Sequence, residues 1–265
     1  MEKIVRYLNR SLLKIKPEHK TDKTEQMHFI CPLCQDQGLI VKGDLAYQCQ
    51  CVKQRAVLKK FSSANMTPFL AAHTFDKFDF RFYSPHLRVD NDGPTYRAMA
   101  EKAFEGAKMF VAHYLEEKTG QGILFAGTVG SGKTFLAGAI TNALLEHEKQ
   151  VLFLVVPDFL DEIRATYQKQ GEFSEAELMD AARKTEVLIL DDLGAHNFTE
   201  WTQNKIFSLI NYRMNHGLPC VITTNLSINQ MNEVIGERTV SRIIEICKIY
   251  RLHVEEDIRV AMRKM

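Results

Sequence analysis

Residues 123–134 read ILFAGTVGSGKT, in which four apolar residues run directly into a complete GxxxxGK[ST] loop. Residues 134–146 follow with apolar side chains at helical spacing. A buried strand before the loop and a helix after it form the context in which this motif holds phosphate groups. The segment therefore predicts that the chain binds a nucleoside triphosphate; the alternative is a chance match or an inactive loop.

Each part of the loop has a physical role. Its glycines let backbone N–H groups converge on phosphate oxygens, Lys133 reaches the β- and γ-phosphates, and the Thr134 hydroxyl ligates Mg²⁺. The residues expected to contact the nucleotide are Gly127, Thr128, Val129, Gly130, Ser131, Gly132, Lys133, Thr134 and Phe135.

Two further apolar segments end in polar residues. Residues 187–190 (VLIL) precede Asp191 and Asp192, and residues 220–224 (CVITT) precede Asn225. Parallel strands deliver such side chains to one edge of a sheet. We expect Asp191 to hold Mg²⁺ through water and Asp192 to polarise the attacking water, and Asn225 to position that water from an intervening strand. A strand that simply ends in a capping Asp is the alternative.

The composition limits the class of protein. A chain of 265 residues with 45% hydrophobic residues can form one sizeable core and a smaller module. No run of about 18 apolar residues and no signal peptide are present, which predicts a cytoplasmic protein whose six cysteines are thiols or metal ligands.

The charge is unevenly distributed. Residues 1–60 hold 12 Lys and Arg against 6 Asp and Glu, and the rest of the chain holds 22 against 27. The basic excess at the amino end is modest, so charge alone does not predict nucleic-acid binding.

Four cysteines near the amino end have the spacing of a zinc ribbon. Cys31 and Cys34 form a CxxC pair, and Cys49 and Cys51 follow as CxC. Four thiolates complete a closed, tetrahedral, structural zinc site, whose metal would contribute to folding of this small module. A redox pair or free thiols are the alternatives, and His28 is a substitute ligand if one cysteine is not used.

The segments around this module suggest the domain limits. Ile4, Val5, Leu8, Leu12 and Ile15 would lie on one stripe of a short helix that packs on a partner or on the module itself. A helix is expected over 53–61, an irregular segment over 62–94 and a helix over 95–117. We therefore expect a module at 1–65, a linker at 66–95 and an ATPase domain at 96–265.

Taken together, GTVGSGKT, VLILDDLG, VITTN and the later GERTVSRI resemble the DnaC, DnaI and IstB group of AAA+ helicase loaders and transposition helpers. The likeness covers residues 70–265. The cysteine cluster is similar to the zinc-binding, helicase-contacting domain of the DnaI-like loaders, although its spacing and length differ.

The resemblance implies an α/β fold: an AAA+ P-loop αβα core with a five-stranded parallel sheet, preceded by a small zinc-binding α+β module. It also implies site roles. Lys133, Asp191, Asp192 and Asn225 keep the roles given above, with Asn225 as sensor 1. Arg242 matches the arginine finger that reaches a neighbouring subunit's γ-phosphate, with Arg238 as a stand-in.

The same resemblance places Arg259 where a sensor-2 arginine would contact the nucleotide of its own subunit. Surface salt bridging is the alternative for each arginine. The family also has an extra helical element, within residues 157–184 here, that holds single-stranded DNA. Tyr167 and Trp201 are candidate stacking residues, and half-buried packing is the alternative for both.

The resemblance, together with the phosphate loop and the four cysteines, implies an ATPase that loads a replicative hexameric helicase of the DnaB type, with ATP, Mg²⁺ and Zn²⁺ as cofactors. The zinc module would bind the helicase, and the ATPase domain would bind single-stranded DNA and further copies of itself. Hydrolysis would be slow until assembly supplies the finger. An IstB-like transposition helper and a non-catalytic, helicase-binding adaptor are the alternatives.

Overall fold

The computed structural model describes residues 31–43, 45–65, 67–117, 121–168, 172–195 and 199–265. The predicted amino-terminal helix and His28 lie outside these ranges. The chain divides into two compact units, Met1–Cys49 and Gln50–Met265, and each is described by itself. Among the described helices, none is long and apolar enough to cross a membrane.

The first unit contains an antiparallel hairpin of β1 (Leu39–Lys42) and β2 (Leu45–Gln48). The turn between the strands uses Gly43, whose φ is 60°, a value that favours glycine. Most side chains of both strands are exposed, including Val41 and Leu45. A hairpin of this size buries too little surface to be stable alone, so it depends on other constraints.

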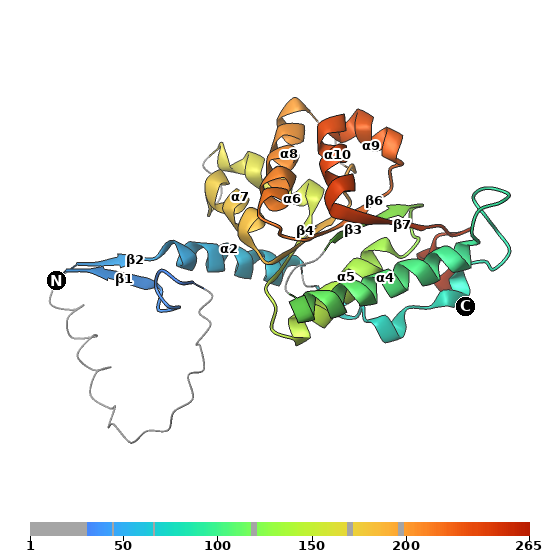
Figure 1. Ribbon diagram of the computed structural model, residues 1–265, viewed down its shortest axis with the longest axis horizontal. Coiled ribbons are helices and arrows are strands. Elements are labelled where there is room, and N and C mark those ends of the chain that lie inside the picture. Colours follow the sequence, from blue (N-terminus) through green and yellow to red (C-terminus); the bar gives the residue numbers. More distant parts are fainter. Residues whose placement is uncertain (1–30, 44, 66, 118–120, 169–171, 196–198) are drawn as a thin grey trace, which may run out of the picture. The chain divides into compact units, whose positions relative to one another are not determined.

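The second unit is a three-layer α/β domain around a five-stranded parallel sheet with the order β4-β5-β6-β3-β7 (Figure 1). This confirms the predicted fold class, with β6 between β5 and β3. The strands are β3 (Gly122–Gly127), β4 (Val151–Val155), β5 (Val187–Asp191), β6 (Cys220–Thr224) and β7 (Cys247–Leu252).

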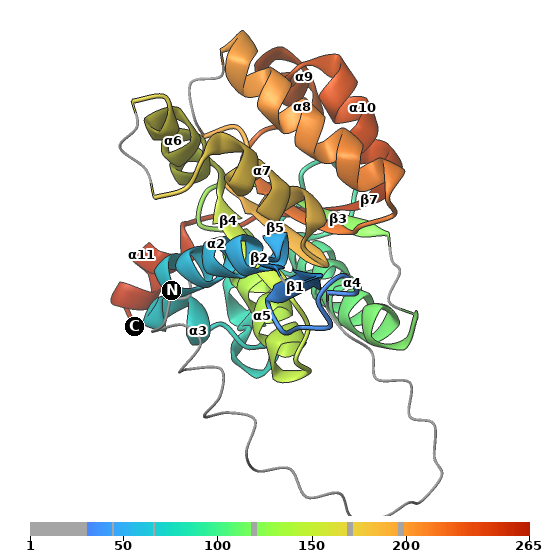
Figure 2. The same cartoon turned by 90° about the vertical axis from the view of Figure 1, so that its left-hand side faces the viewer.

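Helices cover both faces of the sheet, as Figure 2 shows from a second side. The helices and 3₁₀ turns of this unit are α2 (Gln50–Asn65), α3 (Pro68–Ala71), η1 (Phe75–Lys77), η2 (Phe80–Phe82), α4 (Tyr96–Glu117), α5 (Lys133–Glu146), α6 (Val156–Thr166), α7 (Glu175–Lys184), α8 (Glu200–Asn215), α9 (Ile228–Ile235), α10 (Glu237–Ile246) and α11 (Ile258–Arg263).

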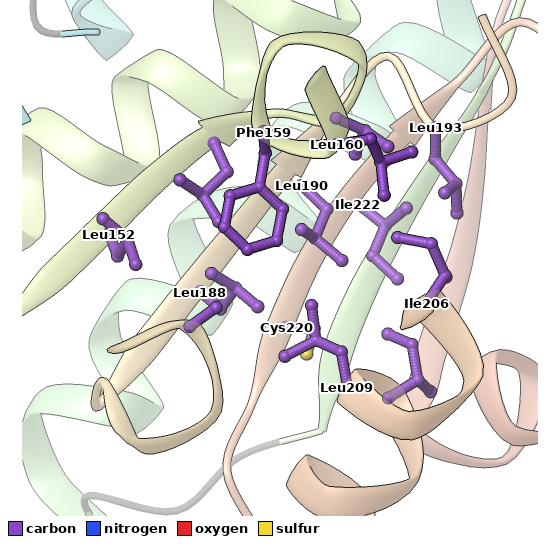
Figure 3. Packing of buried hydrophobic residues seen from close by; sticks show 14 of the residues in the cluster. Leu152, Phe159, Leu160, Leu188, Leu190, Leu193, Ile206, Leu209, Cys220 and Ile222 are labelled. Atoms are coloured by element: carbon purple, nitrogen blue, oxygen red, sulfur yellow. The ribbon is translucent and has the colours of Figure 1, made fainter. Parts of the chain in front are cut away.

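The alternation of side chains along each strand creates two cores. Leu152 and Leu154 of β4 face the core formed with α6 to α10, whereas Val151 and Phe153 face the core formed with α4 and α5. Figure 3 shows the first core, where Phe159 and Ile206 pack over strand residues. Because both faces are covered, β3, β4, β5 and β6 are nearly continuous apolar runs whose sequences do not alternate, whereas the edge strand β7 includes exposed Lys248 and Arg251.

The described part of the segment predicted as a linker, residues 67–95, contributes side chains to the second core. Its α3, η1 and η2 bring Leu70, Phe78 and Tyr83 into contact with residues of α4 and α5. The three turns are too short to show a helical period, so the sequence pattern of this segment indicates only an irregular connection.

Candidate functional site

The phosphate loop lies where predicted, between β3 and α5. Gly132 is the N-cap of α5 and has φ 87° and ψ 10°, in the left-handed region. Gly130 also has a positive φ, 69°. Both conformations favour glycine, and they direct successive backbone N–H groups toward the helix N-terminus, where anions bind.

Lys133 points back into this loop and is buried. Its Nζ donates to the carbonyl oxygen of Thr128 at 2.6 Å and to that of Gly127 at 3.1 Å. Burial lowers the pKa of Lys133 to about 8, although the carboxylates of Asp192 and Asp191 act in the opposite direction. The ammonium therefore lies within the loop that would receive phosphates.

The side chains of Thr134, the residue after Lys133, and Asp191 contact each other. The Thr134 hydroxyl lies 3.0 Å from Asp191 Oδ1 and 3.2 Å from Oδ2, so the end of β5 faces the first turn of α5. A hydroxyl and a carboxylate are the oxygen ligands by which a protein holds Mg²⁺ beside phosphates. The geometry fits the predicted magnesium site.

Thr223 of β6 organises both acids, a role that the sequence analysis did not identify. Its hydroxyl donates to Asp191 Oδ1 at 2.7 Å and accepts the Asp192 N–H at 2.9 Å. The register of β5 beside β6 brings these residues together. The only sequence signal is that Thr223 lies two residues before the predicted sensor Asn225.

Burial raises the pKa of Asp191 to about 6, and the carboxylate of Asp192 adds to this effect. The hydroxyls of Thr223 and Thr134 partly offset it, because they donate to the ionised carboxylate. Asp192 is more exposed and has φ 57°, an uncommon conformation that turns the chain away from β5. Asn225 follows the end of β6 and is exposed.

The residues after β7 lie against the phosphate loop. The Ile258 N–H donates to the Gly130 carbonyl at 3.1 Å, and the Val254 N–H donates to Thr128 Oγ1 at 3.3 Å. Arg259, the predicted sensor-2 residue, is largely exposed, and its Nε lies 3.2 Å from Asp257 Oδ1. The structure thus brings Arg259 to the same edge of the domain as the loop.

Arg242 and Arg238 both belong to α10, away from the residues that line the loop. Arg242 forms an exposed ion pair with Glu245 at 3.3 Å. Both arginines line a surface cavity of about 550 Å³ whose other lining residues are Phe207, Glu237 and Ser241. An arginine finger is expected on the outside of its own domain, because it acts on a neighbouring subunit.

Tyr167 and Trp201, the two aromatic residues proposed to contact DNA, lie side by side. Their ring centroids are 6.0 Å apart, and the Trp201 Nε1–H donates to the Tyr167 hydroxyl at 3.1 Å. Arg164 and Lys205 lie over the Trp201 ring at 5.4 and 5.6 Å. Aromatic faces next to cationic groups are the components of single-strand binding sites.

The four cysteines of the amino-terminal cluster converge. The Sγ atoms of Cys31, Cys34, Cys49 and Cys51 all lie within 4.8 Å of one another, and those of Cys31 and Cys49 are 3.7 Å apart. A tetrahedral zinc with Zn–S bonds of about 2.3 Å separates its sulfur ligands by about 3.8 Å. The donor set and its spacing therefore fit a structural zinc.

The phosphate loop follows β3, the acids lie at the end of β5, and β6 lies between these two strands. This arrangement defines an ATP-binding protein of the AAA+ class. The chain belongs to the family described as IstB-like ATP binding proteins, whose sequence pattern matches residues 95–257.

The chain is also similar to replicative helicase loaders. It is 30% identical to the loader DnaI of Bacillus subtilis (strain 168) over 178 residues, 62% of this chain and 55% of that protein. It is 30% identical to the loader DnaC of Escherichia coli (strain K12) over 132 residues, 49% and 54% of the two chains. The chain therefore matches about half the length of these curated relatives.

A crystal structure of the DnaC helicase loader has the same fold. It superposes with a TM-score of 0.56 over 70% of this chain and 99% of that chain, at 23% identity.

Proposed function

We propose that this protein is an ATP-dependent loader of a replicative hexameric helicase of the DnaB type. The observation that carries the proposal is the combination of a nucleotide site with a four-cysteine cluster in a chain that is similar to two named loaders. A cytoplasmic bacterial protein, encoded by the host or by a phage, is consistent with this function.

We propose ATP hydrolysis at the phosphate loop. The Lys133 ammonium would contact the β- and γ-phosphates, and Thr134 and Asp191 would hold Mg²⁺, which when bound neutralises developing phosphate charge. Asp192 would accept a proton from the attacking water, which Asn225 would orient. The contacts among Thr134, Asp191 and Thr223 support this assignment, because they preset the ligand oxygens.

We propose that self-association completes the site. Arg242 would stabilise the γ-phosphate of a neighbouring copy, and Arg259 would contact the nucleotide of its own copy. The support is their placement: Arg242 on an outer helix and Arg259 beside the loop. Hydrolysis would then be slow in the monomer and faster in the assembly.

We propose two binding surfaces for macromolecules. The zinc-bound hairpin unit, whose strands expose Val41, Leu45 and Tyr47, would contact the helicase. Tyr167 and Trp201 would stack on bases of single-stranded DNA; in support, their rings lie side by side and Arg164 and Lys205 lie over the Trp201 ring.

The experiment is a loading assay in which the purified helicase is transferred to a circular single strand. Wild-type protein with ATP should increase the amount of helicase on the circle, whereas Lys133→Ala and Cys49→Ser should each abolish the increase. A transposition helper would bind duplex DNA and leave helicase loading unchanged. A non-catalytic adaptor would bind the helicase equally well with Lys133→Ala.

A further inference from the structure

Tyr83 lies beneath the phosphate loop, although it is 48 residues away in the sequence. Its side chain is 1% exposed, and its hydroxyl donates to the carbonyl oxygen of Ser131 at 2.8 Å. Burial raises the pKa of this hydroxyl well above its ordinary value, so the group stays a donor. The acceptor Ser131 belongs to the predicted nucleotide site, whereas Tyr83 was not predicted to take part in it.

The loop and Tyr83 fit each other closely. A Cβ added at Gly132 would lie 2.6 Å from the Tyr83 hydroxyl oxygen, closer than real Cβ contacts. The Tyr83 ring stacks on Phe78 with centroids 5.5 Å apart and planes 21° apart, which holds the ring in place. The second glycine of the motif, Gly132, therefore has two roles. It permits a positive φ, and its missing side chain leaves space for the Tyr83 hydroxyl.

The Ser131 carbonyl belongs to a planar trans peptide, in which C=O and N–H point in opposite directions. If the carbonyl is held toward Tyr83, the N–H of Gly132 must face the other side of the loop. That side is where the backbone N–H groups of such a loop hold phosphate oxygens. The orientation of one peptide thus depends on a hydroxyl from a distant segment.

We propose that Tyr83 is a positioning residue that fixes the Ser131–Gly132 peptide and so pre-forms the phosphate-binding loop. The inference rests on ATP binding at this loop and is independent of helicase loading. Without the hydroxyl, the buried carbonyl loses its donor and the peptide can rotate, so each binding event must reorder the loop.

The test is Tyr83→Phe, which keeps the ring and its stacking on Phe78. The matched control is Tyr114→Phe: Tyr114 is 3% exposed, and its hydroxyl lies 3.3 Å from Glu186 Oε2, remote from the loop. Affinities for ATP, ADP and AMP are measured by displacement of a fluorescent ADP, and thermal unfolding is measured without nucleotide.

We expect Tyr83→Phe to weaken ATP and ADP binding about tenfold, the size of effect that loss of one buried hydrogen bond produces. AMP should lose less affinity than ADP, because it carries only an α-phosphate and lacks the β-phosphate that the N–H groups of the loop hold. Tyr114→Phe should bind all three nucleotides as wild type does. Unchanged ADP affinity in Tyr83→Phe would overturn the proposal. So would equal losses for ADP and AMP, or an equal loss in Tyr114→Phe, since each indicates general destabilisation.

The same measurements separate this inference from the proposed ATPase function. Wild-type protein that binds ADP but does not hydrolyse ATP would contradict the hydrolysis proposal alone. If Tyr83→Phe is too unstable at room temperature, its ADP and AMP affinities are compared at low temperature. Their ratio is still informative, because partial unfolding lowers both affinities equally.

Discussion

Asp191 combines two opposing requirements within one residue. Its side chain is 4% exposed, and burial disfavours the charge that a magnesium ligand needs. Thr134 and Thr223 donate to the carboxylate and retain part of the charged form. The proposed Mg²⁺ ligand would therefore lower the stability of the nucleotide-free protein, as functional residues often do.

Asp191→Asn should stabilise the nucleotide-free protein and abolish Mg²⁺-dependent turnover. The folded pKa of Asp191, about 6, exceeds its ordinary value of 3.8, so its contribution to stability is present at low pH and is lost as pH rises through about 6. Asparagine has no charge to bury, so the free energy of unfolding of Asp191→Asn should exceed that of wild type by about 1–3 kcal/mol at pH 8 and by less at pH 5. Urea unfolding at both pH values measures it, and an equal gain at both would contradict the account.

Thr223→Val should shift the pH dependence of ATP turnover. Loss of the hydroxyl removes a donor that lowers the Asp191 pKa, so the acid limb of the profile should move to higher pH. Thr224→Val is the matched control, because the Thr224 hydroxyl donates to the Leu193 carbonyl at 2.6 Å and not to Asp191. An acid limb that moves equally in both variants would refute the role of Thr223.

Among the elements, α8 has a structural role that its composition does not suggest. Its Arg213 is fully buried and donates to five backbone carbonyls, those of Ala182, Arg183, Thr185, Glu186 and Pro219. These carbonyls end α7 and precede β5 and β6. One guanidinium thus provides hydrogen-bond donors to backbone carbonyls that lie just before β5 and β6. These are the strands that lead to the two acids and to Asn225.

Arg213→Met should lower the free energy of unfolding by at least about 3 kcal/mol, because several buried carbonyls lose their donor at once. Arg164→Met, which removes a half-exposed arginine from α6, is the control and should cost less than about 1 kcal/mol. Chemical denaturation measures both. If both variants lose a similarly small free energy of unfolding, the prediction is wrong, because water then replaces the Arg213 guanidinium.

At this scale, the sequence predicts elements that have a strong period or a motif. The strands β3, β4, β5 and β6 and the helices α4 and α5 are apparent as apolar runs or helical spacing. By contrast, β7 escapes prediction, because it is an edge strand with the charged residues Lys248 and Arg251 and it follows α10 without a turn residue. Tyr83 and Thr223 escape as well, since their roles depend on segments that meet only in the folded domain.

For the molecule as a whole, we expect metal and nucleotide to occupy separate sites with separate roles. Cys49→Ser or a chelator should remove one zinc per chain and abolish helicase binding, while ADP affinity stays within about twofold of wild type. Cys247→Ala, at a buried cysteine of the sheet, is the control and should keep the zinc. Elemental analysis measures the zinc content of each variant, and titration measures its ADP affinity. A variant that loses ADP binding together with zinc would contradict separate roles.

We expect ATP turnover to depend on assembly through Arg242. This is measured as turnover across a protein concentration series, with and without single-stranded DNA, for wild type, Arg242→Ala and Arg238→Ala. Both arginines lie on α10 and line the same cavity, so Arg238→Ala controls for the loss of surface charge. The account predicts DNA-stimulated, concentration-dependent turnover that Arg242→Ala reduces about 100-fold or more and Arg238→Ala largely retains. Turnover that is flat with concentration, insensitive to DNA and unchanged in Arg242→Ala would contradict it.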